Sequence, residues 1–78
     1  MKQLILYTKE QCSLCDVVKA QLETLRPTYP HELVEVDITQ DQELYLLYRY
    51  VIPVVQVGEK TLKAPITLWQ LSEILTDQ

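Results

Sequence analysis

Two cysteines stand three positions apart in the segment Cys12-Ser13-Leu14-Cys15, and they are the only cysteines of the 78-residue chain. The pair follows an apolar run typical of a strand and opens an amphipathic run typical of a helix, so Cys12 is expected at the helix N-terminus. There, unpaired N–H groups and the positive end of the helix dipole favour a thiolate. Two thiols one helical turn apart can also close on each other without backbone rearrangement. This placement predicts thiol–disulfide chemistry.

We expect Cys12 to attack a substrate disulfide and Cys15 to resolve the product. The pKa of a free thiol, ~8.5, can be lowered at the exposed helix start by the dipole and by a cation such as Lys9. Cys15 lies one turn further in and is expected to be more buried. Its attack on the mixed disulfide would release reduced substrate and leave a Cys12–Cys15 disulfide to be reduced again. Glu10 and Asp16 act in the opposite sense, because carboxylates that point at the sulfur oppose thiolate formation.

The elements around the pair can be read from hydrophobic periodicity. An apolar run over residues 3–8 predicts a central strand covered on both faces. From residue 13 up to Pro27, apolar side chains recur at three- and four-residue steps, which predicts a helix. Partial alternation over residues 33–38 predicts a strand nearer the sheet edge, and the strand–helix–strand unit should have a right-handed crossover. His31, in the turn before that strand, is interpreted as solvated surface. The apolar stripe of the helix is expected to comprise Leu14, Val17, Val18, Leu22 and Leu25.

The second half of the chain has its own start and stop signals. The segment Thr39-Gln40-Asp41-Gln42 fits a capping box that opens a helix running to Val51, and Pro53 stops that helix. A hairpin is predicted over residues 54–64, turning at Gly58-Glu59-Lys60. The segment Thr67-Leu68-Trp69-Gln70 fits a second capping box, which starts a last helix. The side chains expected to face inward are Leu44, Leu47, Tyr48 and Val51 in the former helix and Leu68, Leu71, Ile74 and Leu75 in the latter.

The element order is therefore βαβαββα, and residues 1–78 are expected to form one domain. Eleven acids against seven bases give a net charge of −4 without a basic cluster. Nucleic acid is therefore not an expected partner. No apolar run approaches the ~18 residues of a membrane span, so no membrane association is expected. The first residues lack a signal-peptide cleavage site, which favours a cytoplasmic protein.

Over nearly its whole length the sequence resembles the thioredoxin superfamily, and within it the glutaredoxin-like branch. Leu6-Tyr7-Thr8-Lys9-Glu10-Gln11-Cys12-Ser13-Leu14-Cys15 is similar to the strand, basic residue and CxxC of glutaredoxins, and Val51-Ile52-Pro53-Val54-Val55-Gln56-Val57-Gly58 to their later proline segment. The resemblance implies an α/β three-layer sandwich, with a four-stranded mixed sheet and helices on both faces. It also implies that the Ile52–Pro53 peptide bond is cis, with Pro53 facing the CxxC and the Ile52 backbone close to the sulfurs.

The sequence departs from glutaredoxins at two places. Ser13-Leu14 stands where those proteins generally have Pro-Tyr, and Ala64-Pro65-Ile66-Thr67 replaces a Gly-Gly-x-Asp-like stretch that helps to hold glutathione. Because this stretch is replaced, the resemblance does not imply that glutathione binds, and glutathione is only a candidate co-substrate. Thr67 and the N–H groups after it could bind a substrate carboxylate, since a helix N-terminus suits an anion. We expect no bound cofactor, no metal site and a monomer.

The predicted function is that of a dithiol–disulfide oxidoreductase, acting on disulfide-containing proteins or glutathione mixed disulfides and restored by a reductase. Two alternatives stay open: a thioredoxin-fold binding or redox-sensing module, and a dimeric [2Fe–2S] carrier through Cys12. A purely structural disulfide would stabilise so short a loop by only ~2 kcal/mol. A zinc site would need four ligands, of which the cysteines supply two. Pro53 could also be an ordinary proline at the start of a strand.

Overall fold

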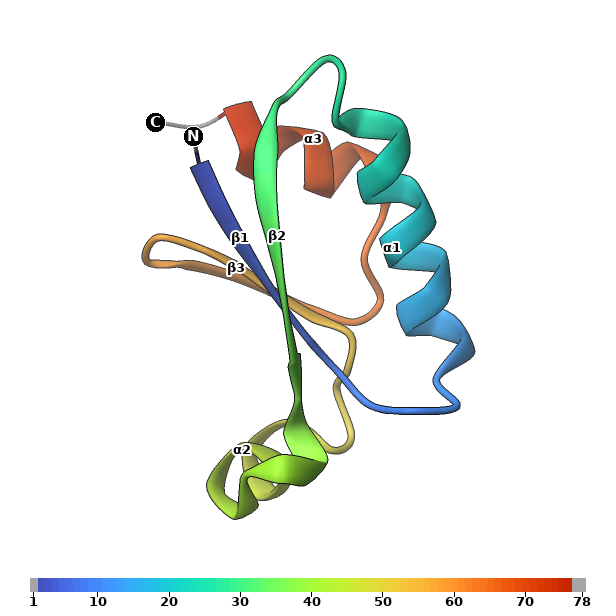
Figure 1. The fold of residues 1–78 in the computed structure, drawn as a ribbon, viewed down its shortest axis with the longest axis vertical. Helices are drawn as coiled ribbons and strands as arrows, with labels where there is room; N and C mark the ends of the chain where they lie inside the picture. The colour runs from blue at the N-terminus through green and yellow to red at the C-terminus, as the bar shows by residue number, and fades with distance from the viewer. Residues whose placement is uncertain (1, 77–78) are drawn as a thin grey trace.

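The computed structural model describes residues 2–76 of the chain. Its elements are β1 (Lys2–Thr8), α1 (Ser13–Leu25), β2 (His31–Asp37), the short 3-10 helix η1 (Ile38–Gln40), α2 (Gln42–Tyr48), β3 (Val54–Val57), β4 (Lys60–Lys63) and α3 (Leu68–Thr76). The order of the strands and α-helices is the predicted βαβαββα (Figure 1).

The four strands form one mixed sheet in the order β2-β1-β3-β4. β1 pairs with β2 in parallel and with β3 antiparallel, and β3 pairs antiparallel with β4. β2 therefore lies at an edge, as its partial alternation predicts. The turn between β3 and β4 contains Gly58 at φ 59°, a left-handed conformation that glycine adopts without steric cost. The sheet and its three helices confirm the predicted α/β class.

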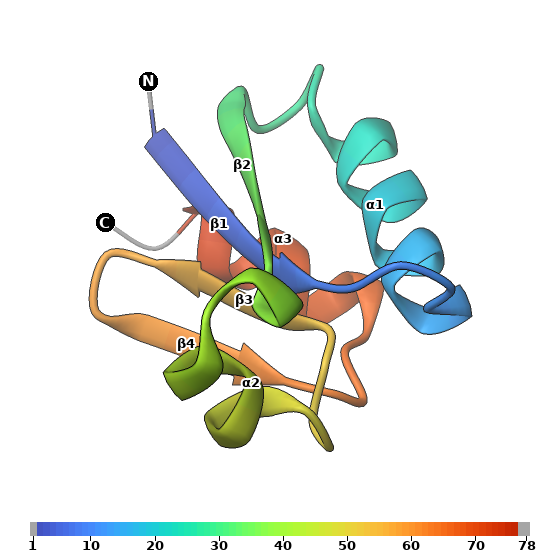
Figure 2. The same cartoon turned by 60° about the horizontal axis from the view of Figure 1, so that its bottom comes forward.

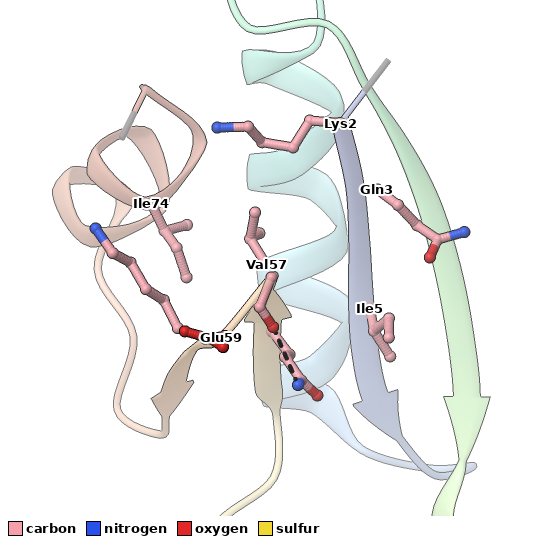
Figure 3. A pocket seen from close by; sticks show the side chains of 9 residues that line it. Lys2, Gln3, Ile5, Val57, Glu59 and Ile74 are labelled. Atoms are coloured by element: carbon pink, nitrogen blue, oxygen red, sulfur yellow. Dashed lines mark hydrogen bonds between the residues drawn. The ribbon is translucent and has the colours of Figure 1, made fainter. Parts of the chain in front are cut away.

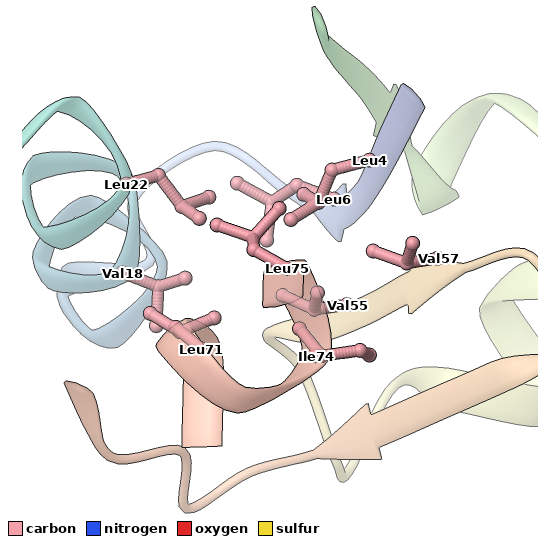
Figure 4. Close-up of a cluster of buried hydrophobic side chains, with 9 residues drawn as sticks. All are labelled: Leu4, Leu6, Val18, Leu22, Val55, Val57, Leu71, Ile74 and Leu75. Carbon is pink, nitrogen blue, oxygen red and sulfur yellow. The ribbon is translucent and has the colours of Figure 1, made fainter. Parts of the chain in front are cut away.

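The hydrophobic core lies between one face of the sheet and the helices α1 and α3 (Figure 4). Successive residues of a strand point to opposite faces, so β1 buries Leu4 and Leu6 in this core. The buried members of the cluster are Leu4, Leu6, Val18, Leu22, Val55, Val57, Leu71, Ile74 and Leu75.

The opposite face of the sheet is covered by α2 only at one end. Figure 2 shows α2 in front of the sheet and α3 behind it. The Tyr48 ring of α2 lies 4.9 Å from the ring of Tyr7, which alternates to this face of β1. Because α2 has only seven residues and buries none of them, Ile5 and Tyr7 stay half-exposed. The prediction that residues 3–8 are covered on both faces is therefore only partly right.

Each helix buries a narrower stripe than the periodicity predicts. α1 buries Cys15, Val18 and Leu22, whereas Leu14 and Val17 are 61% and 52% exposed. The stripe that packs on the sheet follows positions i, i+3 and i+7, and residues one position earlier are rotated about 100° away from it. Leu47 in α2 and Leu68, the first residue of α3, are also exposed rather than inward-facing.

Helix caps agree with the sequence at α3 and differ at α2. At α3, the Thr67 N–H donates to Gln70 Oε1 at 2.9 Å and the Gln70 N–H donates to Thr67 Oγ1 at 3.1 Å, which confirms the capping box. At α2 the cap is Asp41, whose carboxylate accepts the N–H groups of Glu43 and Leu44. The expected cap, Thr39, belongs instead to η1.

His31 is not solvated surface: its side chain is 3% exposed at the start of β2. Its Nδ1 lies 2.7 Å from the carbonyl oxygen of Tyr29, so a proton on Nδ1 can be donated to that carbonyl. This bond engages Nδ1 alone, because Nε2 is buried without a hydrogen-bond partner among the described residues. Among the described residues no helix has the length and apolar character needed to cross a bilayer.

Candidate active site

Cys12 and Cys15 are joined by a disulfide, with their Cα atoms 5.2 Å apart. Cys12 is the N-cap of α1, and its Sγ accepts the N–H of Cys15 at 3.2 Å. Cys12 is half-exposed, whereas Cys15 is fully buried against the core. One sulfur of the pair is therefore accessible to a partner molecule and the other is shielded by the protein.

Gln11 makes the turn that brings Cys12 to this position. It has φ 59°, the only positive φ of a non-glycine residue in residues 2–76. A residue with a side chain adopts this left-handed conformation at a cost of about 1–2 kcal/mol relative to the right-handed one. Such outliers tend to occur where the surrounding structure over-determines a functional geometry. Here the turn separates the end of β1 from the first turn of α1.

Three connections meet at the end of the sheet where the disulfide lies. Tyr7, near the end of β1, pairs with Val54, the first residue of β3, and Val54 pairs with Lys63, the last residue of β4. The Ala64 N–H also donates to the Val51 carbonyl at 3.1 Å. The β1–α1, α2–β3 and β4–α3 connections therefore leave the sheet at a common end, as Figures 1 and 2 show.

The predicted site residues belong to these three connections, except Cys15, which lies in the first turn of α1. Lys9 directly follows β1 and is exposed. Ile52 is half-buried and Pro53 is fully buried, directly before β3, and the Ile52–Pro53 peptide bond is cis. The Ala64–Pro65 peptide bond is also cis.

Thr67 is the residue before α3, and the next two residues, Leu68 and Trp69, line a hollow with Leu25 at the end of α1 that is opposite Cys12. Its N–H and its hydroxyl are both engaged by Gln70 in the capping box. The N–H and the hydroxyl of Thr67 are therefore not available to a substrate. Only the N–H groups of the residues that follow Thr67 can bind one.

Asp16, expected to oppose a Cys12 thiolate, lies close to a cation. Lys19 Nζ is 3.8 Å from the Asp16 carboxylate and 3.0 Å from the carboxylate of Glu35 on β2. The hydrogen bond and the charge of Glu35 raise the pKa of Lys19, so the amino group stays protonated across the neutral range. Lys19 therefore offsets part of the Asp16 charge near the disulfide.

Sequence reasoning missed three further residues at this end: Arg49, Tyr50 and Lys63. The guanidinium of Arg49 lies 4.6 Å from the ring centroid of Tyr50, whose side chain is 85% exposed directly before the Val51–Pro53 segment. Proximity to Pro53 in the sequence could have indicated the first two residues. Lys63 is brought there by strand register alone.

A hollow of about 690 Å³ lies at the other end of the sheet (Figure 3). Its walls come from the start of β1, the β3–β4 turn and α3, and include Ile5, Val57, Glu59 and Ile74. None of the predicted site residues lines it. The chemistry indicated by the cysteines is therefore separate from this hollow.

Comparison with known proteins also supports thiol–disulfide chemistry at the two cysteines. A sequence profile of the glutaredoxin-like domain matches residues 3–75. None of the curated proteins compared with the chain matches it. The chain is similar to the X-ray structure of a protein from X. campestris, with 27% identity over 92% of this chain and 93% of that one and a TM-score of 0.78.

Two further structures share the fold. A protein from Nitrosomonas europaea, solved by NMR, is 26% identical over 96% of this chain and 92% of its own, with a TM-score of 0.82. Oxidized thioredoxin O2 from Arabidopsis thaliana has 15% identity over 96% of this chain and 72% of its own, with a TM-score of 0.75. The fold and the Cys12–Cys15 pair together support a redox thiol–disulfide role.

Proposed function

The chain belongs to the glutaredoxin-like domain family, and from that premise we propose that it is a dithiol–disulfide oxidoreductase with Cys12 as nucleophile and Cys15 as resolving thiol. The observation that carries the proposal is the asymmetry of the pair: Cys12 is half-exposed at the helix N-terminus, and Cys15 is buried one turn behind it. A nucleophile must reach its substrate, whereas a resolving thiol needs only to reach the nucleophile. The observed exposures fit these two roles.

In the proposed reaction the reduced protein meets a substrate disulfide. The Cys12 thiolate forms a bond to one substrate sulfur, and the other substrate sulfur leaves as a thiolate and takes up a proton. The Cys15 thiol then loses its proton and attacks Cys12 Sγ, which releases the second substrate thiol and forms the Cys12–Cys15 disulfide. Two electrons and two protons thus pass from the protein to the substrate, and a separate reductant must return them.

The N-terminus of α1 supplies the activation that Cys12 needs. The Cys15 N–H already points at Cys12 Sγ at 3.2 Å, and an N–H donor binds a thiolate better than a thiol. The positive end of the helix dipole acts in the same sense. No external base is then required, because a preformed thiolate can attack directly.

The Ile52–Pro53 edge is the proposed docking position for the substrate chain beside the disulfide. Ile52 lies outside β3, so its backbone can pair with an extended substrate segment. Lys9 would contact the substrate from the β1 side, and Thr67 from the start of α3. The proposed substrates are protein disulfides or glutathione mixed disulfides, with a cellular reductase restoring the dithiol.

Single cysteine variants test the assignment of roles. Cys12→Ser is expected to abolish turnover of a disulfide substrate, because no nucleophile remains at the accessible position. Cys15→Ser is expected to accumulate a mixed disulfide on Cys12, because the resolving step is lost. Intact-mass analysis after acid quenching and alkylation identifies both species. Wild-type turnover in Cys12→Ser, or an adduct that forms on Cys15 instead, would contradict the mechanism.

A further inference from the structure

Three cations of this acidic chain have no carboxylate within ion-pair distance among residues 2–76: Lys9, Arg49 and Lys63. Two other cations form ion pairs: Lys19 with Asp16 and Glu35, and Arg26 with Glu23. In a protein of net charge −4, a cation has more acidic than basic side chains available to it. Three cations without an acidic partner are therefore informative if they lie together.

All three lie at the disulfide end of the sheet. Lys9 directly follows β1, Arg49 directly follows α2, and Lys63 ends β4 opposite Val54. Pro53 directly precedes Val54, so Lys63 lies opposite the residue that follows the proposed docking edge, and Arg49 comes four residues before Pro53 in the chain. The remaining lysines, Lys2 and Lys60, begin β1 and β4 at the other end.

Three of the acidic side chains near this end are engaged by other groups. Asp37 ends β2 and accepts hydrogen bonds from Thr39, and Asp41 caps α2. Asp16 lies next to Lys19. Glu10, beside Lys9, and Glu43, in the first turn of α2, are exposed. Because β2 and β3 lie on opposite sides of β1, Asp37 at the end of β2 and Lys63 at the end of β4 also lie on opposite sides of β1.

Arg49 is also held in place. Its guanidinium lies 4.6 Å from the centroid of the exposed Tyr50 ring and 5.8 Å from that of Tyr45. Stacking on aromatic rings restricts the long side chain and leaves its planar N–H groups free to bind a carboxylate, often in a bidentate manner. Arg49 thus combines contacts to two aromatic rings with a charge that has no carboxylate partner among residues 2–76.

We propose that the substrate of this site is a protein disulfide flanked by acidic side chains, which Arg49 and Lys63 bind beside the Ile52–Pro53 edge. The inference rests on the proposed oxidoreductase function and names its substrate class. Charges within about 10 Å of each other still interact at moderate salt, and such complementarity acts mainly on the rate of association. The predicted signature is therefore a salt-dependent preference in the rate of disulfide exchange.

The test measures single-turnover reduction by the pre-reduced, desalted protein. The substrates are three disulfide-linked peptides that differ only in having Glu, Gln or Lys beside the cysteines, and oxidized glutathione as a small anionic disulfide. At low salt we expect the Glu peptide to react about 10-fold faster than the Lys peptide, with the ratio falling as salt is added. The double variant Arg49→Gln/Lys63→Gln should lose most of that ratio, because the carboxylates of the Glu peptide no longer meet the two cations.

Arg26→Gln is the charge control. It makes the net charge more negative by one unit, half the change in the double variant, and Arg26 is the C-cap of α1, at the opposite end of that helix from Cys12. Its rates and its Glu-to-Lys ratio should equal those of the wild type. Thermal unfolding of each variant checks that the fold is intact.

Equal rates with the Glu and Lys peptides, or an unchanged ratio in the double variant, would overturn the substrate class while leaving the oxidoreductase function intact. Oxidized glutathione reacting faster than the Glu peptide, with the same loss in the double variant, would assign the cations to the tripeptide and overturn the protein assignment. Failure to reduce any of the four disulfides would instead refute the proposed function itself.

Discussion

At the scale of single residues, Gln11 is the position where the backbone around the disulfide is most constrained. Its φ of 59° lies in the left-handed region, which β-branched side chains rarely adopt. We expect Gln11→Val to lower the free energy of unfolding by about 1–2 kcal/mol, because the turn into α1 becomes strained. Urea unfolding of the oxidized protein measures the change. Gln11→Gly is the control and should unfold at or above the wild-type midpoint. A neutral Gln11→Val would contradict the account of the turn.

The sequence predicted the chemistry of individual residues better than their surroundings. The CxxC spacing and its place before an amphipathic run were enough to predict the pair and the N-terminal position of Cys12. The burial of His31 was not predictable, because it depends on a hydrogen bond to the Tyr29 carbonyl. The pairing of Lys19 with Glu35 was equally hidden, since it joins residues of α1 and β2 that only the folded sheet brings together.

At the scale of elements, the reciprocal bonds between Thr67 and Gln70 define the start of α3. We expect Thr67→Ala to lower the free energy of unfolding by about 1 kcal/mol, because the Gln70 N–H loses its acceptor. Chemical denaturation at neutral pH measures the loss. Thr67→Ser keeps the hydroxyl and serves as the control. If the two variants were equally stable, the capping bond would not support the helix.

The 3-10 helix η1 gives the fold a pH-dependent contribution. The hydroxyl and N–H of Thr39 donate to the Asp37 carboxylate and lower its pKa below the ordinary value. A lowered pKa means stability that is present above the unfolded carboxyl pKa of ~3.9 and is lost as the pH falls through the folded value. Asp37→Asn should therefore be less stable than the wild type at pH 7, with the difference shrinking below about pH 4. Urea midpoints against pH measure this, and a difference independent of pH would contradict it.

The order and type of the elements followed from periodicity because α1, α3 and the strands each have a clear apolar face. α2 was the exception. Its cap was expected at Thr39 and lies at Asp41, since the residues between form η1. Its apolar face was expected to be buried, yet Leu47 is 63% exposed. A seven-residue helix cannot span the sheet face, and sequence periodicity does not indicate how far a face is covered.

At the scale of the whole molecule, one core supports both the fold and the site. Leu6 is fully buried in that core on β1, which leads directly to the Lys9–Cys12 turn. We expect Leu6→Ala to cost about 2–5 kcal/mol, a large part of the 5–15 kcal/mol typical of a domain. Thermal and urea unfolding measure the loss. Leu46→Ala, on the exposed surface of α2, should change stability by less than about 0.5 kcal/mol. Similar losses in the two variants would contradict the assignment of the core.

The meeting of three connections at one end is a property of the complete sheet. Lys9, Cys12, Pro53 and Thr67 come from three separate connections, and strand register places all three at one end. The sequence indicated these residues through the family resemblance, which carries that arrangement with it. Arg49 and Lys63 lay outside the motifs, so their positions beside Pro53 became evident only from the fold.

A redox titration of the purified protein tests the central claim most directly. The protein is equilibrated in glutathione and dithiothreitol buffers of graded potential, quenched with acid, alkylated and analysed by intact mass. The account predicts a reversible two-electron transition between the Cys12–Cys15 disulfide and the dithiol, with any mixed disulfide located on Cys12. A disulfide that never forms across these buffers, or one that never reduces, would contradict an oxidoreductase and leave a binding protein with the same fold.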